Sequence, residues 1–147
     1  MKFEIPKEST IENNSDCYII AGNNKRILIL PDVHIPNHSS RSILATINYA
    51  RKFKPTHIIF NGDMIEGGSV SHYRKKPGLF MENEIVPVRQ FIQYISHNFP
   101  KAKLIYKIGN HELRLTHYLM ENAQALFGLS NLSWESLFEA EKYKMDI

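Results

Sequence analysis

Three short apolar runs, each followed at once by a cluster of polar residues, constrain the fold of this chain more than any other feature. The runs lie at 26–30, 57–60 and 103–108. Between them, 39–53 and 84–99 carry apolar residues at the three- and four-residue spacing of an amphipathic helix. Strands that alternate with helices in this way are typical of an α/β protein with a largely parallel sheet. We therefore predict a layered α/β fold.

A further apolar run precedes the first predicted strand, and the two together predict a hairpin. Residues 16–21 and 26–30 flank a Gly-Asn-Asn stretch at 22–24. These residue types tolerate the positive φ angles of a tight turn. The second strand of this hairpin is then the first strand of the parallel sheet.

The remaining segments predict a long loop and two more helices. Residues 66–82 contain glycines and a proline and predict a loop with at most a short helix. Pro87 falls in the first turn of the helix predicted at 84–99, where proline is tolerated. Further helices are expected at 111–126 and 133–142.

Composition excludes several classes of protein. The 18 Lys and Arg residues against 15 Asp and Glu residues give a net charge of +3, far from that of a protein that coats nucleic acid, although a local basic patch could still bind phosphates. The one cysteine, Cys17, excludes an intramolecular disulfide and fits a reducing compartment. The apolar runs are too short to cross a membrane, and 1–8 has no signal-peptide core. We expect a cytoplasmic protein without a membrane partner.

Polar side chains follow all three predicted strands at the point where each strand ends. They are Asp32 and His34 after the first strand, Asp63 after the second, and Asn110 and His111 after the third. In open α/β sheets, ligands bind beyond the carboxyl ends of the strands. Carboxylate, amide and imidazole groups suit manganese, iron or zinc, whereas the lack of further cysteines excludes a thiolate site. The sequence therefore predicts a metal site at this edge of the sheet.

The spacing within the clusters suggests how the side chains would act. Asp32 and His34 are two residues apart, so on an extended segment both point to the same side and can bind one ion. The two oxygens of Asp63 can bridge two ions, and Asn110 offers an amide oxygen at a helix start. His111, beside it, could donate a proton to a leaving group. The N-terminus of that helix favours an anion such as phosphate.

The three clusters resemble the first three motifs of the calcineurin-like metallophosphoesterase superfamily. The matching motifs are Asp-x-His at 32–34, Gly-Asp-x-x-Glu at 62–66 and Gly-Asn-His-Glu at 109–112. The resemblance covers roughly Ile27 to Tyr118. It implies an α/β/β/α sandwich, of which this chain holds the N-terminal half, and hydrolysis of phosphate mono- or diesters.

The resemblance also implies a role for each residue. Asp32 and His34 would bind the first of two divalent ions (manganese, iron or zinc), Asp63 would bridge both, and Asn110 would bind the second ion and touch the phosphate. A metal-bound hydroxide would attack the phosphorus in line with the leaving oxygen. His111 would be the general acid that protonates the leaving oxygen.

Four further residues have two interpretations each. Glu66 either orients a ligand histidine or plays no part, and Glu112 either supports the site from behind or only interacts favourably with the helix dipole. Arg74, in the basic loop 72–76, either holds a substrate phosphate, of a nucleotide or nucleic acid, or belongs to a solvated loop. Arg114 either points toward the phosphate or forms a surface ion pair.

The family pattern continues with a histidine and a Gly-His-x-His motif, and nothing after Glu112 matches either. Three explanations compete: a fragment, a degenerate and inactive relative, or replacement by His38, His72 or His117. We favour a fragment, because 143–147 resembles the beginning of a strand.

We therefore predict one metallophosphoesterase domain over 1–147, truncated on its C-terminal side, whose substrate is a phosphate ester. The rival function is a non-catalytic binding or interaction module that keeps the fold. A metal-free nucleotide-binding module would need a Gly-rich phosphate loop, which this sequence lacks.

Overall fold

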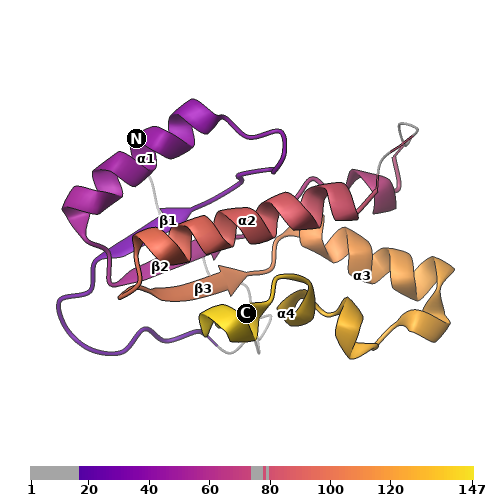
Figure 1. Ribbon diagram of the computed structural model, residues 1–147. Coiled ribbons are helices and arrows are strands. Elements are labelled where there is room, and N and C mark those ends of the chain that lie inside the picture. The colour runs from indigo at the N-terminus through magenta and orange to yellow at the C-terminus, as the bar shows by residue number, and fades with distance from the viewer. Residues whose placement is uncertain (1–16, 74–77, 79) are drawn as a thin grey trace, which may run out of the picture.

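The computed structural model describes residues 17–73, 78 and 80–147, and its helices surround a small parallel sheet (Figure 1). Short 3₁₀ turns lie at 68–70, 124–126, 130–132 and 140–143. The strands and helices are β1 (Ile27–Leu30), α1 (Ser40–Phe53), β2 (His57–Asn61), α2 (Glu82–Asn98), β3 (Lys103–Lys107), α3 (Asn110–Asn122) and α4 (Trp134–Leu137).

The sheet has the strand order β1-β2-β3, and both pairs of neighbours are parallel. Ile27 pairs with His57, which in turn pairs with Lys103, so the strands start and end nearly level. The three loops that follow the strands therefore leave the same edge of the sheet. The prediction of a mixed α/β fold with a parallel sheet is confirmed.

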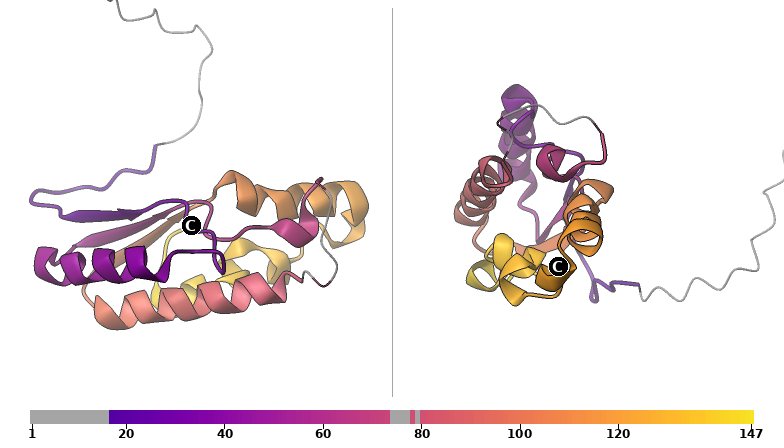
Figure 2. Two further views of the ribbon diagram at one scale, coloured as in Figure 1. Left: turned by 90° about the horizontal axis from the view of Figure 1, so that it is seen from above. Right: turned by 90° about the vertical axis from the view of Figure 1, so that its right-hand side faces the viewer.

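One face of the sheet forms the core. Alternate residues of β1 and β2, such as Leu30 and Phe60, are buried, as the two-residue period of a strand requires, whereas three consecutive residues of β3, Leu104 to Tyr106, are buried. Both α1 and α2 lie along this face (Figure 2), and α4 adds Phe138, whose ring centroid is 4.9 Å from that of Tyr106. On the opposite face Ile29 remains 54% exposed.

The helix α1 shows why its boundaries follow from the sequence. Ser39 caps its start, with the side chain accepting a hydrogen bond from the backbone N–H of Ser42. Lys54 ends it in the left-handed conformation, one residue before Pro55. The helix predicted at 39–53 is thus confirmed almost to the residue.

The predicted hairpin is wrong. Residues 17–21 form no strand, and β1 pairs only with β2 among the described residues; residue 16 lies outside them. Tyr18 and Ile19 stay exposed, so an antiparallel pair here would bury little. Parallel pairing with β2 instead places Leu28 and Leu30 in the core.

The other helices depart from prediction at their ends. α2 begins at Glu82, which places Pro87 in its second turn rather than its first. α3 runs over Asn110–Asn122, shorter than the predicted 111–126. The helix predicted at 133–142 is broken, because Glu139 has a φ of 53° and separates α4 from a 3₁₀ turn.

The end of the described chain lies beside β3. Asp146 forms one parallel bridge with Ile105, on the edge that β2 leaves free. The Lys103 ammonium lies 2.8 Å from the Asp146 carboxylate and holds the pKa of that carboxyl below its usual range. This single bridge lies within 143–147, where we expected a strand to begin. The four-layer sandwich and the domain limits remain predictions.

None of the helices in the described part of the chain is long and apolar enough to cross a membrane.

Candidate metal centre

The loops after β2 and β3 touch each other through two glycines. A Cβ atom added to Gly62, which has a φ of 76°, would lie 2.7 Å from the Cα atom of Gly109. One added to Gly109 would lie 2.2 Å from the Asp63 Oδ1 atom. Both distances are far too short, so only glycine permits this approach. The Gly-Asp and Gly-Asn-His motifs thus meet because each supplies a glycine at the contact.

Three predicted site residues come together at this edge. The ligand atoms of His34, Asp63 and His111 all lie within 4.8 Å of one another. The two imidazole rings meet edge to face, with their centroids 4.6 Å apart. Two nitrogens and a carboxylate oxygen at this separation are donors that zinc, iron or manganese accept. We call these three residues the His-Asp-His cluster.

The buried His34 Nδ1 atom tests whether a metal ion fits. It makes no hydrogen bond to any described residue. The closest carboxylate contact is Glu66 Oε2 at 3.3 Å. A buried polar atom without a partner is costly in a folded protein. A cation beside the cluster would remove this cost, so the residues present fit a divalent ion.

The backbone at the cluster is strained. His34 and Asp63 have φ angles of 52° and 52°, and Asp32 has one of 50°. The left-handed region costs a non-glycine residue about 1–2 kcal/mol. Hydrogen bonds between the loops hold it, including His34 N–H to the Asp63 carbonyl at 3.0 Å and Ile35 N–H to the Met64 carbonyl at 2.7 Å. Strain of this kind collects at functional sites.

His111 is fixed at three points. Its backbone N–H donates to Asp63 Oδ1 over 3.0 Å. Its Nδ1 atom lies 2.8 Å from the Glu66 carbonyl oxygen, which can only accept, so Nδ1 carries the proton. The Nε2 atom then accepts from Arg114 Nη2 at 3.0 Å. The ring is held in one tautomer, with Nε2 covered by Arg114.

Arg114 lies at the centre, and it forms no ion pair with another described residue. Besides His111 it binds the Glu66 carbonyl through Nη1, at 2.7 Å. Its side chain therefore binds both the His111 ring and the Glu66 carbonyl that orients this ring. The Glu66 carboxylate lies near both histidines, with Oε2 3.3 Å from His34 Nδ1 and Oε1 4.0 Å from His111 Nδ1, and its orienting role remains a prediction.

Glu112 holds the loop after β2 and the loop after β3 together. Its fully buried carboxylate accepts hydrogen bonds from the backbone N–H groups of Asp63, Met64 and Gly109, at 2.9, 2.9 and 2.8 Å. The Tyr106 hydroxyl donates to it at 2.7 Å, and burial raises the pKa of that hydroxyl so that it remains a donor. Glu112 thus does far more than interact with the helix dipole.

Glu84 has a similar role that the sequence analysis missed. This buried residue of the first turn of α2 accepts from the backbone N–H groups of Glu66, Gly67 and Gly68, at 2.8, 2.6 and 3.2 Å. It therefore fixes the loop whose Glu66 carbonyl holds His111. The available signal was an acidic residue at a helix start that follows a Gly-Gly loop rich in free N–H groups.

A family model for the calcineurin-like phosphoesterases matches residues 25–144, a range that includes all three loop motifs. The chain belongs to the calcineurin-like phosphoesterase family. It is also similar to the Gene 54 protein of Mycobacterium phage L5, with 24% identity over 129 residues, which is 84% of this chain and 50% of the phage protein. The chain thus spans about half the length of that relative. No solved structure matches it significantly.

Two residues expected in this calcineurin-like phosphoesterase site lie outside the cluster. Asp32 is exposed, and because it and His34 both have positive φ angles, the segment is not extended. The argument from their two-residue spacing is therefore wrong. Asn110 is the first residue of α3, which Gly109 caps, and its side chain is also exposed. Neither side chain makes a hydrogen bond to a described residue.

The spare histidines do not complete the cluster. His117 is exposed, His72 lies 3.7 Å from the Glu121 carboxylate, and His38 lies beside Ser40. Among the described residues, the group of donor atoms close enough to share an ion contains none of them. Arg74 lies outside the described residues.

A hollow of about 520 Å³ is lined in part by Glu66 and Arg114, which contact His111 of the cluster. Tyr73 and Phe80 add exposed aromatic side chains to its wall, and Asn83 adds an amide. A hollow of this size can accept a small organic molecule.

Proposed function

We propose that this chain carries the metal-binding core of a phosphoesterase that hydrolyses phosphate mono- or diesters in the cytoplasm. The observation that carries the proposal is the His-Asp-His cluster, whose ligand atoms lie within 4.8 Å of one another at the carboxyl edge of the sheet. Family membership supports hydrolase activity and a metal-dependent reaction.

Within the cluster, His34 and Asp63 would bind one divalent ion, which would act as a Lewis acid on a phosphoryl oxygen. Asp63 supplies the negative charge that compensates the ion. The glycine contact and the Glu112 carboxylate hold Asp63 in place before any ligand binds. Preorganised donors of this kind need no rearrangement during the reaction.

We assign the general acid to His111. In the doubly protonated imidazolium form, Nδ1 would keep its hydrogen bond to the Glu66 carbonyl, and Nε2 would donate the second ring proton to the leaving oxygen. Arg114 covers Nε2 in this structure. We propose that Arg114 turns from Nε2 to a phosphate oxygen when a substrate enters, since a guanidinium binds phosphate in bidentate fashion.

A second ion would complete the dinuclear centre that the family resemblance implies. Asn110 is the donor we assign to it, together with the second Asp63 oxygen, whereas Asp32 would join His34 and Asp63 at the first ion. The side chains of Asp32 and Asn110 are exposed and are not engaged by hydrogen bonds to described residues.

The rival function is a non-catalytic module that binds a metal or a phosphate ester without turnover. The lack of a match to the later histidine motifs of the family after Glu112 supports this alternative. Nucleotides or nucleic acids are the phosphate esters that we propose as partners in either case.

Manganese binding and hydrolysis of bis(p-nitrophenyl) phosphate test the proposal together. We expect calorimetry to show manganese binding that Asp63→Asn abolishes. His111→Ala should lower the hydrolysis rate by about 10²–10⁴-fold, the usual contribution of a general acid. His117→Ala is the matched control, because His117 is an exposed histidine of the same helix. Binding without hydrolysis would support the rival function, and no binding would reject both.

A further inference from the structure

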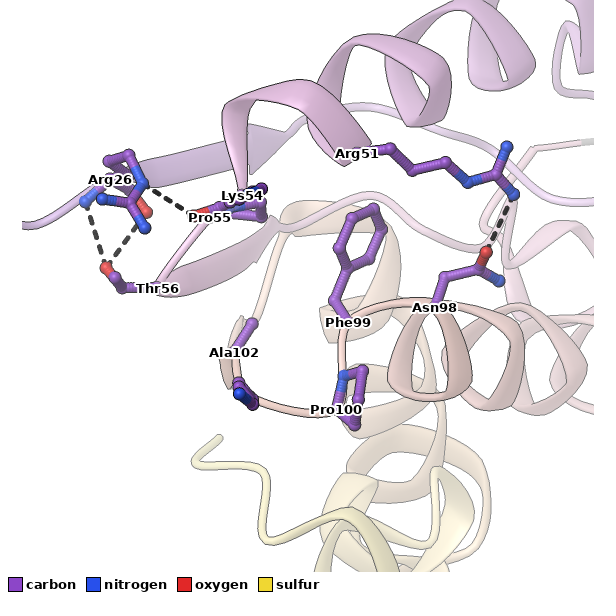
Figure 3. Close-up of a pocket in the computed structure, with 10 residues that line it drawn as sticks. Arg26, Arg51, Lys54, Pro55, Thr56, Asn98, Phe99, Pro100 and Ala102 are labelled. Atoms are coloured by element: carbon purple, nitrogen blue, oxygen red, sulfur yellow. Dashed lines mark hydrogen bonds between the residues drawn. The ribbon is translucent and has the colours of Figure 1, made fainter.

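A second hollow, of about 470 Å³, lies at the opposite end of the sheet from the metal centre (Figure 3). Arg26 precedes β1, Thr56 precedes β2 and Ala102 precedes β3, so the hollow lies at the amino ends of all three strands. A strand of four or five residues is roughly 15 Å long. The hollow is therefore separate from the His-Asp-His cluster and from the space beside it.

The hollow is strongly cationic. Arg26, Arg51, Lys54 and Lys101 line it, and none of the described residues around it is acidic. None of these four cations forms an ion pair within the described part of the chain. Other cations do, as the 2.8 Å contact between Lys142 and Glu139 illustrates. Positive charge is thus concentrated here without compensation.

Neutral groups hold the two arginines in place. The Arg26 Nε atom donates to the Lys54 carbonyl over 2.7 Å. Arg51 donates to the amide oxygens of Asn48 and Asn98, at 3.0 and 2.8 Å. Figure 3 shows the Arg51–Asn98 bond closing one end of the hollow and Arg26 lying at the other. These bonds orient the guanidinium groups but leave their full charge to act on a ligand.

Helix electrostatics account for only part of this arrangement. Arg51 lies in the last turn of α1, where a cation interacts favourably with the helix dipole. Arg26 precedes a strand, but its Nε atom binds the carbonyl of Lys54, the C-cap of α1, so it also lies at that helix end. Lys101 follows the last residue of α2 by three positions and makes no such contact with a described residue. Apolar residues also line the hollow, namely Phe99 and two prolines. Cationic and apolar side chains in one lining are suited to an organic anion.

The spread of the charges distinguishes between possible anions. Neighbouring strands are about 4.8 Å apart, so the cations ahead of β1 and β3 are separated by roughly 10 Å, and one phosphate group is too small to contact them all. A single strand of nucleic acid presents one phosphate after another and also apolar base faces. We propose that this hollow binds single-stranded nucleic acid through its phosphate backbone, without sequence preference.

Fluorescence anisotropy with a labelled 12-nucleotide DNA strand, in excess EDTA, tests the proposal independently of the metal centre. The variant Arg51→Gln/Lys54→Gln should bind at least tenfold more weakly at 50 mM salt. Each phosphate contact contributes about 0.7 to the slope of log affinity against log salt for a single strand, so the slope should fall by about 1.4.

The variant Arg41→Gln/Lys144→Gln is the matched control, because it removes the same charge from exposed positions that do not line the hollow. Its affinity should stay within twofold of that of the unmodified chain. Equal losses in both variants would show attraction to net charge alone and would overturn the proposal. So would an absence of binding, or a mononucleotide that competes as well as the 12-nucleotide strand.

Discussion

Two buried carboxylates, Glu84 and Glu112, hold the loops of the metal centre without a cationic partner among the described residues. Each accepts hydrogen bonds from at least three backbone N–H groups. The donors to Glu112 lie in the loops after β2 and β3, and those to Glu84 lie in the loop whose Glu66 carbonyl holds His111. A hydrogen bond to a charged group contributes about 1.5–3 kcal/mol. These two residues therefore decide whether the cluster has one geometry, although neither would touch a substrate.

Replacing Glu84 by Gln should loosen the site. The amide keeps one acceptor oxygen and turns an NH₂ group toward backbone N–H donors, so we expect a loss of about 1–3 kcal/mol in the free energy of unfolding. Manganese affinity should fall as well, because the loop that carries Glu66 is freed. Urea denaturation and calorimetry measure the two effects.

Glu82→Gln is the control for this change, since Glu82 is an exposed glutamate of the same helical turn. It should alter the free energy of unfolding by less than about 0.5 kcal/mol. Equal stability of the two variants would show that the bonds made by Glu84 contribute nothing to the site.

At the scale of the elements, β1 has one side in the core and the other side on the open face of the sheet. Leu30 is 7% exposed and lies in the core, whereas its neighbour Ile29 is 54% exposed on the other face. The helices α1 and α2 cover the first face (Figure 2). A strand with this pattern gains most of its stability from one side only.

Alanine substitutions on the two faces of β1 should therefore differ sharply. Leu30→Ala should cost about 2–5 kcal/mol, the usual loss for a buried leucine. Ile29→Ala should cost less than about 1 kcal/mol, because its side chain is already half in water. Urea denaturation of both variants makes the comparison. A similar loss of stability in both variants would mean that the open face is covered in solution. Sedimentation analysis would then show whether the chain self-associates.

At the scale of the whole molecule, the metal centre joins segments that are far apart in the sequence. His34, Asp63 and His111 follow three different strands, and the loops that carry them meet only in the folded chain. An unfolded chain cannot bring these donors together, so a metal ion should bind the folded state far more tightly than the unfolded one. Metal binding and global stability are then linked.

Manganese should accordingly raise the melting temperature in proportion to the logarithm of its concentration. At 100 times the dissociation constant the gain is about 2.7 kcal/mol. EDTA should reverse it, and Asp63→Asn should remove it. Magnesium at the same concentration should raise the melting temperature less, because it prefers oxygen ligands and the cluster offers two imidazoles. An unchanged melting curve for the unmodified chain would contradict a metal site here.

Local patterns in the sequence were enough to predict the parallel α/β fold and to place His34, Asp63 and His111 at one sheet edge. Strand and helix periodicities depend on nearby residues, and parallel strands must present their carboxyl ends together. The left-handed backbone at His34 was beyond such reasoning, because contacts with a loop some 30 residues away hold it.

Only the tertiary structure decided which distant groups meet. It left β1 without the predicted hairpin partner, directed Glu84 to the amides of a loop before its own helix, and gathered Arg26, Arg51 and Lys101 around one hollow. Nothing in the spacing of these residues reveals those contacts. The packing of whole elements against each other sets them, and that packing depends on all the side chains of the core at once.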